Sequence, residues 1–302
     1  MTDYLIAVGS VILLALNFII QKLYQRRTGS SAKSSSAFSL LSGVLSIIYL
    51  LIMNGAVLEV TAYSAINATL KSICGLAYTV IGFKIMREGS VAYYMMFLMT
   101  GGMLLPAIYG WLFLGEEVKL LHLLGVLIII FAIVFSNAGE SRKKPKIILM
   151  CSGVFVLNGC VSILSKLHQT CREYAVVSTK GYSLLGGMAS FLSALGLFIF
   201  ACVRESQNAK KETSPEGQAG QRVHFPYRAL LLVPLYSIIG VFSGLMQLEC
   251  AKNLPASMLY PIITGGTVGL TGLFAALIFG ERLPRRGLVG VMLCILGTIF
   301  FI

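Results

Sequence analysis

One basic residue interrupts a long apolar stretch in a way that points to binding chemistry. Lys71 lies about two turns into the apolar run 63–86, deeper than the residues that usually mark the end of such a run. A charged group inside an apolar helix is costly unless it faces a cavity or a partner. Lys71 is therefore a candidate anchor for a carboxylate or phosphate. The alternative is a lysine whose aliphatic stem lies along the helix while its amine reaches water at the interface.

Amide, hydroxyl and aromatic side chains supply the other candidate ligands. Neutral amides hydrogen-bond neutral or zwitterionic solutes, and they also link helices to one another. Tyrosine rings could instead form an aromatic cage for an organic cation, which needs no acidic residue. With Lys71, the predicted substrate-binding residues are Asn17, Tyr78, Tyr94, Asn158, Tyr236, Gln247 and Tyr260.

The elements that carry these residues are too apolar for an ordinary soluble domain. Of the 302 residues, 57% are hydrophobic and 12% are charged, whereas soluble domains carry about 25% charged residues. A bilayer is the natural solvent for such a chain, and roughly 20 apolar residues are needed to cross it. Ten runs qualify: 4–24, 38–58, 63–86, 91–113, 120–137, 147–167, 179–203, 229–251, 256–279 and 287–302.

These runs should be helices, because backbone groups in lipid must be paired within their own segment. The predicted fold class is therefore an all-α membrane protein with ten transmembrane helices. The first run has no basic segment before it and no small-residue cleavage site after it, so we expect a retained helix rather than a signal peptide.

Motifs for metal binding or enzymatic catalysis are lacking in the sequence. The seven cysteines are scattered without the spacing of metal ligands, and the three histidines all lie near predicted loops. We therefore expect no enzyme activity, no metal and no cofactor.

The net charge of +12 is unevenly distributed. Most of the Lys and Arg residues fall in the loops that follow every second run, from the first to the ninth, while the acids divide evenly between the two faces. Because loops rich in Lys and Arg stay in the cytoplasm, this bias predicts that both termini lie outside. The basic excess is thus an orientation signal rather than a sign of nucleic-acid binding.

The two halves of the chain repeat each other. Gly115-Glu116 and Gly125-Val126 in one half correspond to Gly280-Glu281 and Gly290-Val291 in the other. The hydrophilic stretch 204–228 is the expected insertion, a cytoplasmic connector. The predicted units are 1–140 and 141–302, and since each holds five helices, the second enters the membrane in the opposite orientation. Such inverted repeats are typical of secondary transporters.

The Gly-Glu turn followed by a glycine-bearing last helix resembles the drug/metabolite transporter superfamily, and within it the ten-helix group with two EamA-type repeats. The resemblance covers nearly the whole chain and is strongest over the last two helices of each half. It implies that the runs 91–113 and 256–279 line a central cavity, which favours Tyr94 and Tyr260. It also implies that both termini lie inside, opposite to the charge bias. Relatives carry many substrates, so the fold does not choose one.

The sequence predicts a multi-pass transporter of the cell membrane for a small polar or zwitterionic metabolite. Its site would lie between the first, third, fourth, sixth, eighth and ninth helices. One alternative is export or import of an organic cation or drug through an aromatic cage; another is a membrane scaffold without turnover. Glu249, three residues from Lys252, is either part of a local ion pair or a coupling carboxylate. Glycines that recur along one face of a helix allow close packing within one chain as well as between two chains. The sequence therefore does not decide between a monomer and a homodimer.

Overall fold

The part of the chain that the structure describes is helical throughout, apart from short connections. The structure is a computed structural model that describes residues 2–28, 32–87, 91–117, 119–137, 145–211, 230–279 and 285–301. Ten helices lie within these ranges, which confirms the predicted all-α class. They are α1 (Thr2–Thr28), α2 (Ala32–Met53), α3 (Ala62–Arg87), α4 (Val91–Phe113), α5 (Leu120–Asn137), α6 (Pro145–Thr170), α7 (Thr179–Lys211), α9 (Leu232–Asn253), α10 (Ala256–Phe279) and α11 (Arg285–Ile299).

Helix boundaries differ from the predicted runs, most clearly in α2 and α7. The second run was expected to continue to residue 58, but α2 ends at Met53, where Gly55 and Ala56 adopt positive φ angles of 66° and 59° and turn the chain. The seventh was expected to end at 203, but α7 continues to Lys211 and so includes the first part of the predicted connector. This extension is rich in Lys, Glu, Gln and Ala, which favour helix even where they are too polar for a membrane.

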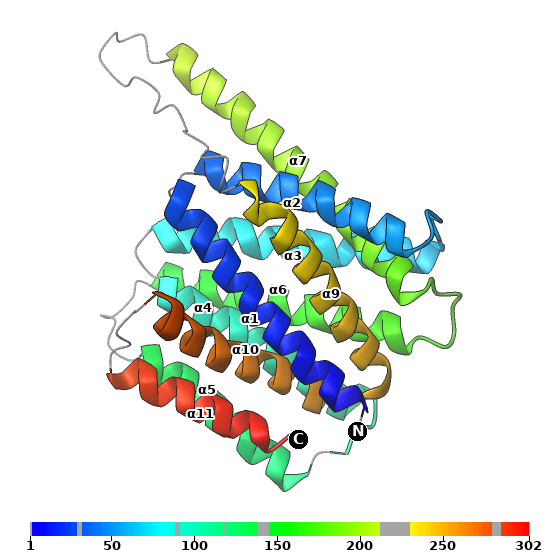
Figure 1. Cartoon of the computed structure of the whole chain (residues 1–302), viewed down its shortest axis with the longest axis vertical. Coiled ribbons are helices and arrows are strands. Elements are labelled where there is room, and N and C mark those ends of the chain that lie inside the picture. Colours follow the sequence, from blue (N-terminus) through cyan, green and yellow to red (C-terminus); the bar gives the residue numbers. More distant parts are fainter. Residues whose placement is uncertain are drawn as a thin grey trace.

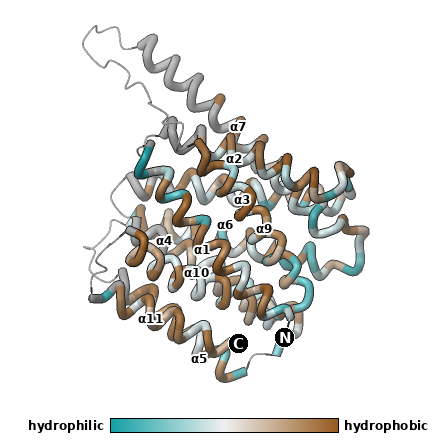
Figure 2. The backbone as a smooth tube through the Cα atoms, in the orientation of Figure 1, coloured by the Kyte–Doolittle hydropathy of each residue, from teal (hydrophilic) through white to brown (hydrophobic). Residues whose placement is uncertain are grey.

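Four helical segments among the described residues are long and apolar enough to cross a bilayer: Thr2–Tyr24, Pro145–Thr170, Leu232–Asn253 and Ala256–Ile278. Shorter apolar segments occur in α2, α4, α5 and α11. Hydrophilic residues gather toward helix ends and connections (Figure 2). Large apolar side chains face outward in number, as Leu149 and Leu277 do at 75% and 72% exposure. Such a surface fits a membrane protein; a bilayer crossing by every helix remains a prediction.

The helices pack as two groups, and α5 and α11 lie side by side at the periphery (Figure 1). In the first body, α3 and α4 both pack on α6, and α7 packs on α3. In the second body, α9 and α10 both pack on α1, and α2 packs on α9. The bodies meet where α4 contacts α10 and α2 contacts α7, while α5 and α11 pack on each other. Each body therefore combines helices from both halves of the sequence.

The connection between α2 and α3 is joined to the start of α7 through Glu59. Its carboxylate accepts hydrogen bonds from the backbone N–H of Ser178 at 2.7 Å and from the Ser178 hydroxyl at 2.9 Å. The backbone bond, with a smaller contribution from the hydroxyl, holds the pKa of Glu59 below its ordinary value. A carboxylate in this place satisfies N–H groups that the first turn of a helix leaves unpaired, and so it positions α7.

The tightest helix contact in the first body depends on a glycine. A Cβ added at Gly101 in α4 would fall on the backbone of Phe155 in α6. Asn158 reinforces the contact one turn later, where its amide donates to the carbonyl of Leu98 at 2.7 Å. The small residue lets the two backbones approach closely, as is typical of helix pairs in membranes.

Replacing Gly101 with alanine should force α4 and α6 apart. Overpacking of this kind costs roughly 1–3 kcal/mol, so purified G101A should unfold at a lower temperature than wild type in the same detergent. Gly153→Ala in α6 is the matched control, because nothing lies within 4 Å of the added Cβ. The control should be as stable as wild type or slightly more so. Equal unfolding temperatures for G101A and wild type would contradict the close contact.

Candidate functional site

A cavity of about 640 Å³ lies between the two bodies, lined by α2, α3, α6, α7, α9 and α10. Its lining is rich in hydroxyl groups, and Lys71 is the one charged residue among the described residues that line it. The hydroxyl-bearing lining residues are Ser46, Ser72, Tyr78, Thr79, Ser162, Ser165, Tyr182, Ser183, Ser190, Ser193 and Tyr260. A cavity with this lining can hydrogen-bond a polar solute and offers it one positive charge.

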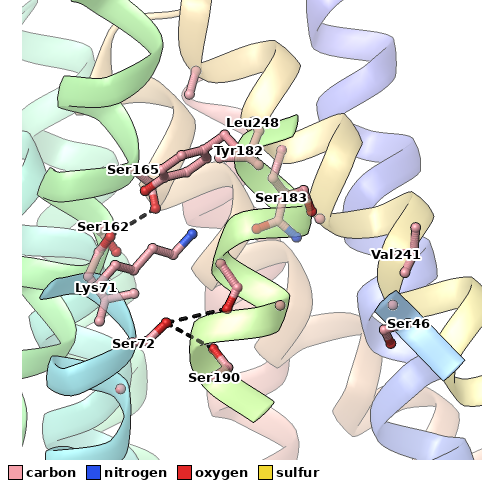
Figure 3. A pocket seen from close by; sticks show the side chains of 18 of the residues that line it. Ser46, Lys71, Ser72, Ser162, Ser165, Tyr182, Ser183, Ser190, Val241 and Leu248 are labelled. Atoms are coloured by element: carbon pink, nitrogen blue, oxygen red, sulfur yellow. Dashed lines mark hydrogen bonds between the residues drawn. The ribbon is translucent and has the colours of Figure 1, made fainter. Parts of the chain in front are cut away.

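The side chain of Lys71 extends from α3 into the cavity toward Tyr182 (Figure 3). Its amine lies 5.1 Å from the centre of the Tyr182 ring, within the range of a cation–π contact. The side chain is partly exposed, and no Asp or Glu is among the described residues that line the cavity. The amine thus faces the cavity, where an anionic group could reach it; binding of a carboxylate or phosphate by Lys71 stays a prediction.

Hydrogen bonds and ring stacking hold Tyr182 in place beside Lys71. Its hydroxyl donates to the Asn67 oxygen at 2.8 Å, and its ring stacks on that of His168 with centroids 3.8 Å apart. His168 in turn shares a hydrogen bond of 2.8 Å with the hydroxyl of Ser64. The same hydroxyl accepts a hydrogen bond of 3.1 Å from the backbone N–H of Val177. These contacts connect α3, α6 and the connection before α7, so the orientation of Tyr182 is fixed by three elements.

The opposite side of the cavity continues into a second pocket of about 350 Å³. The two pockets share Ser46, Gly187, Ser190 and Ala194. The second is lined by Gln21 near the end of α1, by Ser39 near the start of α2 and by Tyr236 near the start of α9. It therefore extends from the central cavity toward the end of the bundle that lies away from the two termini of the chain.

Half of the predicted binding residues come together at the central cavity. Lys71, Tyr78, Gln247 and Tyr260 line it, and Tyr236 lines the second pocket. The hydroxyl of Tyr260 donates to the carbonyl of Ser162 at 2.6 Å, so it also joins α10 to α6. The side chain of Tyr94 lies outside the described residues.

The other predicted residues lie elsewhere. Asn17 is buried in α1 beside Gly240 and is not among the residues that line either pocket, and Asn158 joins α6 to α4. Glu249 is on the surface, where it pairs with Lys252 at 2.8 Å and accepts a hydrogen bond from Thr179 at 3.0 Å. Helices α1 and α4 supply none of the described residues that line the central cavity, whereas α2 and α7, which the sequence did not predict to line it, do.

The serines of the cavity are not among the predicted binding residues, although their spacing in the sequence could have identified them. Ser72 and Thr79 in α3 are seven residues apart, as are Ser183 and Ser190 in α7, and residues spaced by seven share one face of a helix. Ser72 shares a hydrogen bond of 3.1 Å with Ser190. These two polar faces therefore meet at the cavity.

Comparison with known proteins supports the fold and names no function. No family model matches the sequence, and no curated protein matches it. The chain is similar to a solved structure described only as "Crystal structure of protein", with a TM-score of 0.68 and 15% sequence identity. The similarity covers 99% of this chain and 96% of the other. At this identity the likeness shows that the whole chain adopts a fold found in an experimental structure.

Removing the Tyr182 hydroxyl should destabilise the contacts that hold this residue beside Lys71. Tyr182→Phe removes the hydroxyl that donates a hydrogen bond to the buried side-chain oxygen of Asn67. Leaving a buried acceptor without its donor lowers the free energy of unfolding by about 1–3 kcal/mol. Tyr260→Phe is the comparison variant, because the Ser162 carbonyl lies within α6, where helical bonding also reaches it. Thermal unfolding should show a larger decrease for Y182F than for Y260F. The reverse order would contradict the importance of the Tyr182–Asn67 hydrogen bond.

Proposed function

We propose that this protein is a secondary transporter of the EamA type in the drug/metabolite transporter superfamily. It carries a small polar or zwitterionic metabolite with an anionic group across the cell membrane by alternating access. The observation that carries the proposal is the hydroxyl-lined cavity between two bodies of apolar helices, with Lys71 as its one described charge. Ionisable groups in such places mark solute pathways.

The pairing of the helices supports an organisation in two inverted repeats. Exchanging the five helices of 1–140 with the five of 141–302, in order, converts the α1–α9 pair into the α6–α3 pair and the α1–α10 pair into the α6–α4 pair. All four pairs pack together. The α2–α9 and α7–α3 pairs correspond in the same way, and the α4–α10, α5–α11 and α2–α7 pairs are converted into themselves. Pairing of this kind is expected when a pseudo-two-fold axis lies in the membrane plane.

The charge and size of the cavity favour a small anionic or zwitterionic solute. The volume of about 640 Å³ falls within the range of roughly 300–1,000 Å³ that is usual for small-molecule sites. A carboxylate or phosphate near the amine of Lys71 replaces water with an opposite charge, while the serines and tyrosines hydrogen-bond the rest of the solute. Opposite charge from the solute offsets the cost of keeping the lysine away from bulk water.

The same arrangement disfavours the cation alternative. An aromatic cage needs free ring faces, and the amine of Lys71 already lies over the ring of Tyr182. A cationic solute in this cavity would also be repelled by the lysine, with no Asp or Glu among the described lining residues to offset it. A scaffold without turnover has no need of a hydroxyl-lined cavity.

Transport in proteoliposomes should depend on the charge of Lys71. We would measure uptake of a radiolabelled zwitterionic amino acid, a dicarboxylate, a phosphate ester and a quaternary ammonium ion. Lys71→Met should reduce uptake of the accepted anionic or zwitterionic probe roughly 10- to 100-fold, the usual effect of losing a hydrogen bond to a charged group. Lys119→Met, at an exposed residue between α4 and α5, should leave it unchanged.

Two results would contradict the assignment of this site. Wild-type uptake by both K71M and Tyr260→Ala would show that the solute binds elsewhere. Uptake of the quaternary ammonium ion alone, increased by K71M, would support the cation alternative instead.

The charge bias predicts which face is outside. Val57 is 56% exposed in the connection between α2 and α3, at the same end of the bundle as both termini (Figure 1). In a background without native cysteines, Val57→Cys should react with an impermeant maleimide in intact cells. Ser214→Cys, in the predicted cytoplasmic connector, should react only after permeabilisation. The opposite pattern would place the termini inside, as the family resemblance implies.

A further inference from the structure

A buried lysine, Lys166, lies beyond the cavity and has no role in the function proposed so far. Lys166, near the end of α6, is 4% exposed, and its amine donates to the carbonyl of Ala251 at 2.9 Å and to that of Leu254 at 2.6 Å. The carboxylate of Glu116 lies 3.8 Å from this amine. We refer to these groups, together with the residues that Glu116 contacts, as the Glu116–Lys166 cluster: Glu116, Lys166, Ala251, Leu254, Ala256 and Ser257.

The cluster forms where one helix ends and the next begins. Helix α9 ends at Asn253 and α10 starts at Ala256, so unpaired carbonyls of one meet unpaired N–H groups of the other. Lys166 binds the carbonyls, and Glu116 accepts from the N–H groups of Ala256 at 2.7 Å and Ser257 at 3.0 Å. Each charge thus has the sign that the adjacent helix end favours.

The Gly-Glu turn of the first half brings the carboxylate to this place. Gly115 adopts a positive φ of 64°, which ends α4 and allows the N–H of Glu116 to donate to the carbonyl of Gly110 at 3.1 Å. The carboxylate then lies over Gly110, where a Cβ would collide with it. The turn therefore does more than connect two helices of one half, because its acid reaches α10 in the other half.

The cluster lies at the end of the central cavity nearest the two termini. Ala251, whose carbonyl binds Lys166, lines the cavity, as does Ser165. Two further contacts join the bodies at this end: Tyr260 donates to the Ser162 carbonyl, and Thr179 donates to Glu249. In each of these links, and in the hydrogen bonds of Lys166 and Glu116 to α9, α10 and their connection, one partner belongs to the first body or its turn and the other to the second body.

The helix pairing is asymmetric in a way that matches this location. Helices α6 and α7 of the first body both contact α9 of the second body. Exchanging the two halves converts these pairs into α1–α3 and α2–α3, which make no comparable contact in the described parts of those helices. The bodies are therefore close together at the cluster end, while the second pocket extends the cavity toward the other end.

We propose that the Glu116–Lys166 cluster is the closure of this end of the cavity and that solute passes this end only after Lys166 leaves the carbonyls of Ala251 and Leu254. The inference rests on the proposed transport function. Every link in the cluster is a hydrogen bond or ion pair, so water can replace each partner when the end opens. Glu116 and Lys166 are positioning residues, since they act on access to the cavity rather than on the solute.

Accessibility of a cavity cysteine tests the closure without any knowledge of the substrate. Ser183 lines the cavity, and Ser183→Cys would be placed in a background without native cysteines. An impermeant thiol reagent is added only on the side at which Val57→Cys reacts. Labelling should be slow with the native cluster and roughly 10- to 100-fold faster with Glu116→Gln or Lys166→Met, since each removes charge-assisted bonds that favour the closed state.

Three variants separate closure from a general loss of structure. Gly110→Ala should also speed labelling, because its Cβ displaces the carboxylate without removing a charge. Lys166→Arg keeps the charge and the donors and should stay close to the native rate. Glu117→Gln, at the adjacent exposed acid, is the matched control and should change nothing. Native labelling rates in E116Q, K166M and G110A would overturn the proposal.

A cross-link between the bodies provides a second measurement that needs no substitution in the cluster. Thr179→Cys and Glu249→Cys replace side chains that are 3.0 Å apart across α7 and α9. Linking them with a short, reducible bifunctional thiol reagent should stop uptake of the accepted probe, and a reductant should restore it. Undiminished uptake by cross-linked protein would overturn the closure. Absence of uptake before cross-linking would instead contradict the transport function, while the labelling result would still decide on the closure.

Discussion

The cost of removing a charge from water explains how this fold uses Lys71 and Lys166. Lys166 is surrounded by its own partners, two backbone carbonyls and the carboxylate of Glu116. Lys71 has the ring of Tyr182 and a cavity without an acid among its described lining residues. Because a buried ion pair contributes little net stability against apolar groups of the same size, the pairing of Lys166 is better explained by a role in selecting one arrangement of helices. On the proposed function, the solute supplies the opposite charge that the described lining residues do not offer Lys71.

The distribution of polar residues in this molecule differs from that in a soluble protein both at the surface and at the central cavity. Large apolar residues face outward on most helices, while several serines and tyrosines line the cavity between the two bodies. Helices α3 and α7 lie next to each other and supply Lys71 and most of the hydroxyl groups that line the cavity. Their polar residues are thus concentrated on the faces that meet at the cavity.

The sequence predicts the helices well because a membrane-length apolar run leaves few other choices for its backbone. Lys71 stands out as a candidate binding residue for a similar reason, since a single charge in an apolar run is conspicuous. Asn158 shows the limit of this reasoning: an amide in such a run can bind solute or join helices, and here it bonds the Leu98 carbonyl. Glu116 and Lys166 could not be paired from the sequence, because each bonds backbone groups at the end of α9 or the start of α10, far away in the chain. Only the packing of the two bodies brings these groups together.

On the proposed mechanism, the contacts of the bundle fall into two kinds with different physical requirements. The α4–α10, α5–α11 and α2–α7 pairs are converted into themselves by exchange of the halves, so they can persist in both states and can be apolar. The largest group of buried apolar residues includes Met103 of α4, Ile129 of α5, and Leu259 and Ile262 of α10. Contacts such as α6–α9 must instead alternate with their counterparts. An apolar contact would expose its surface to water each time it parted, at a cost proportional to its area. The polar links at the Glu116–Lys166 cluster avoid most of that cost, because water replaces the hydrogen bonds that are lost.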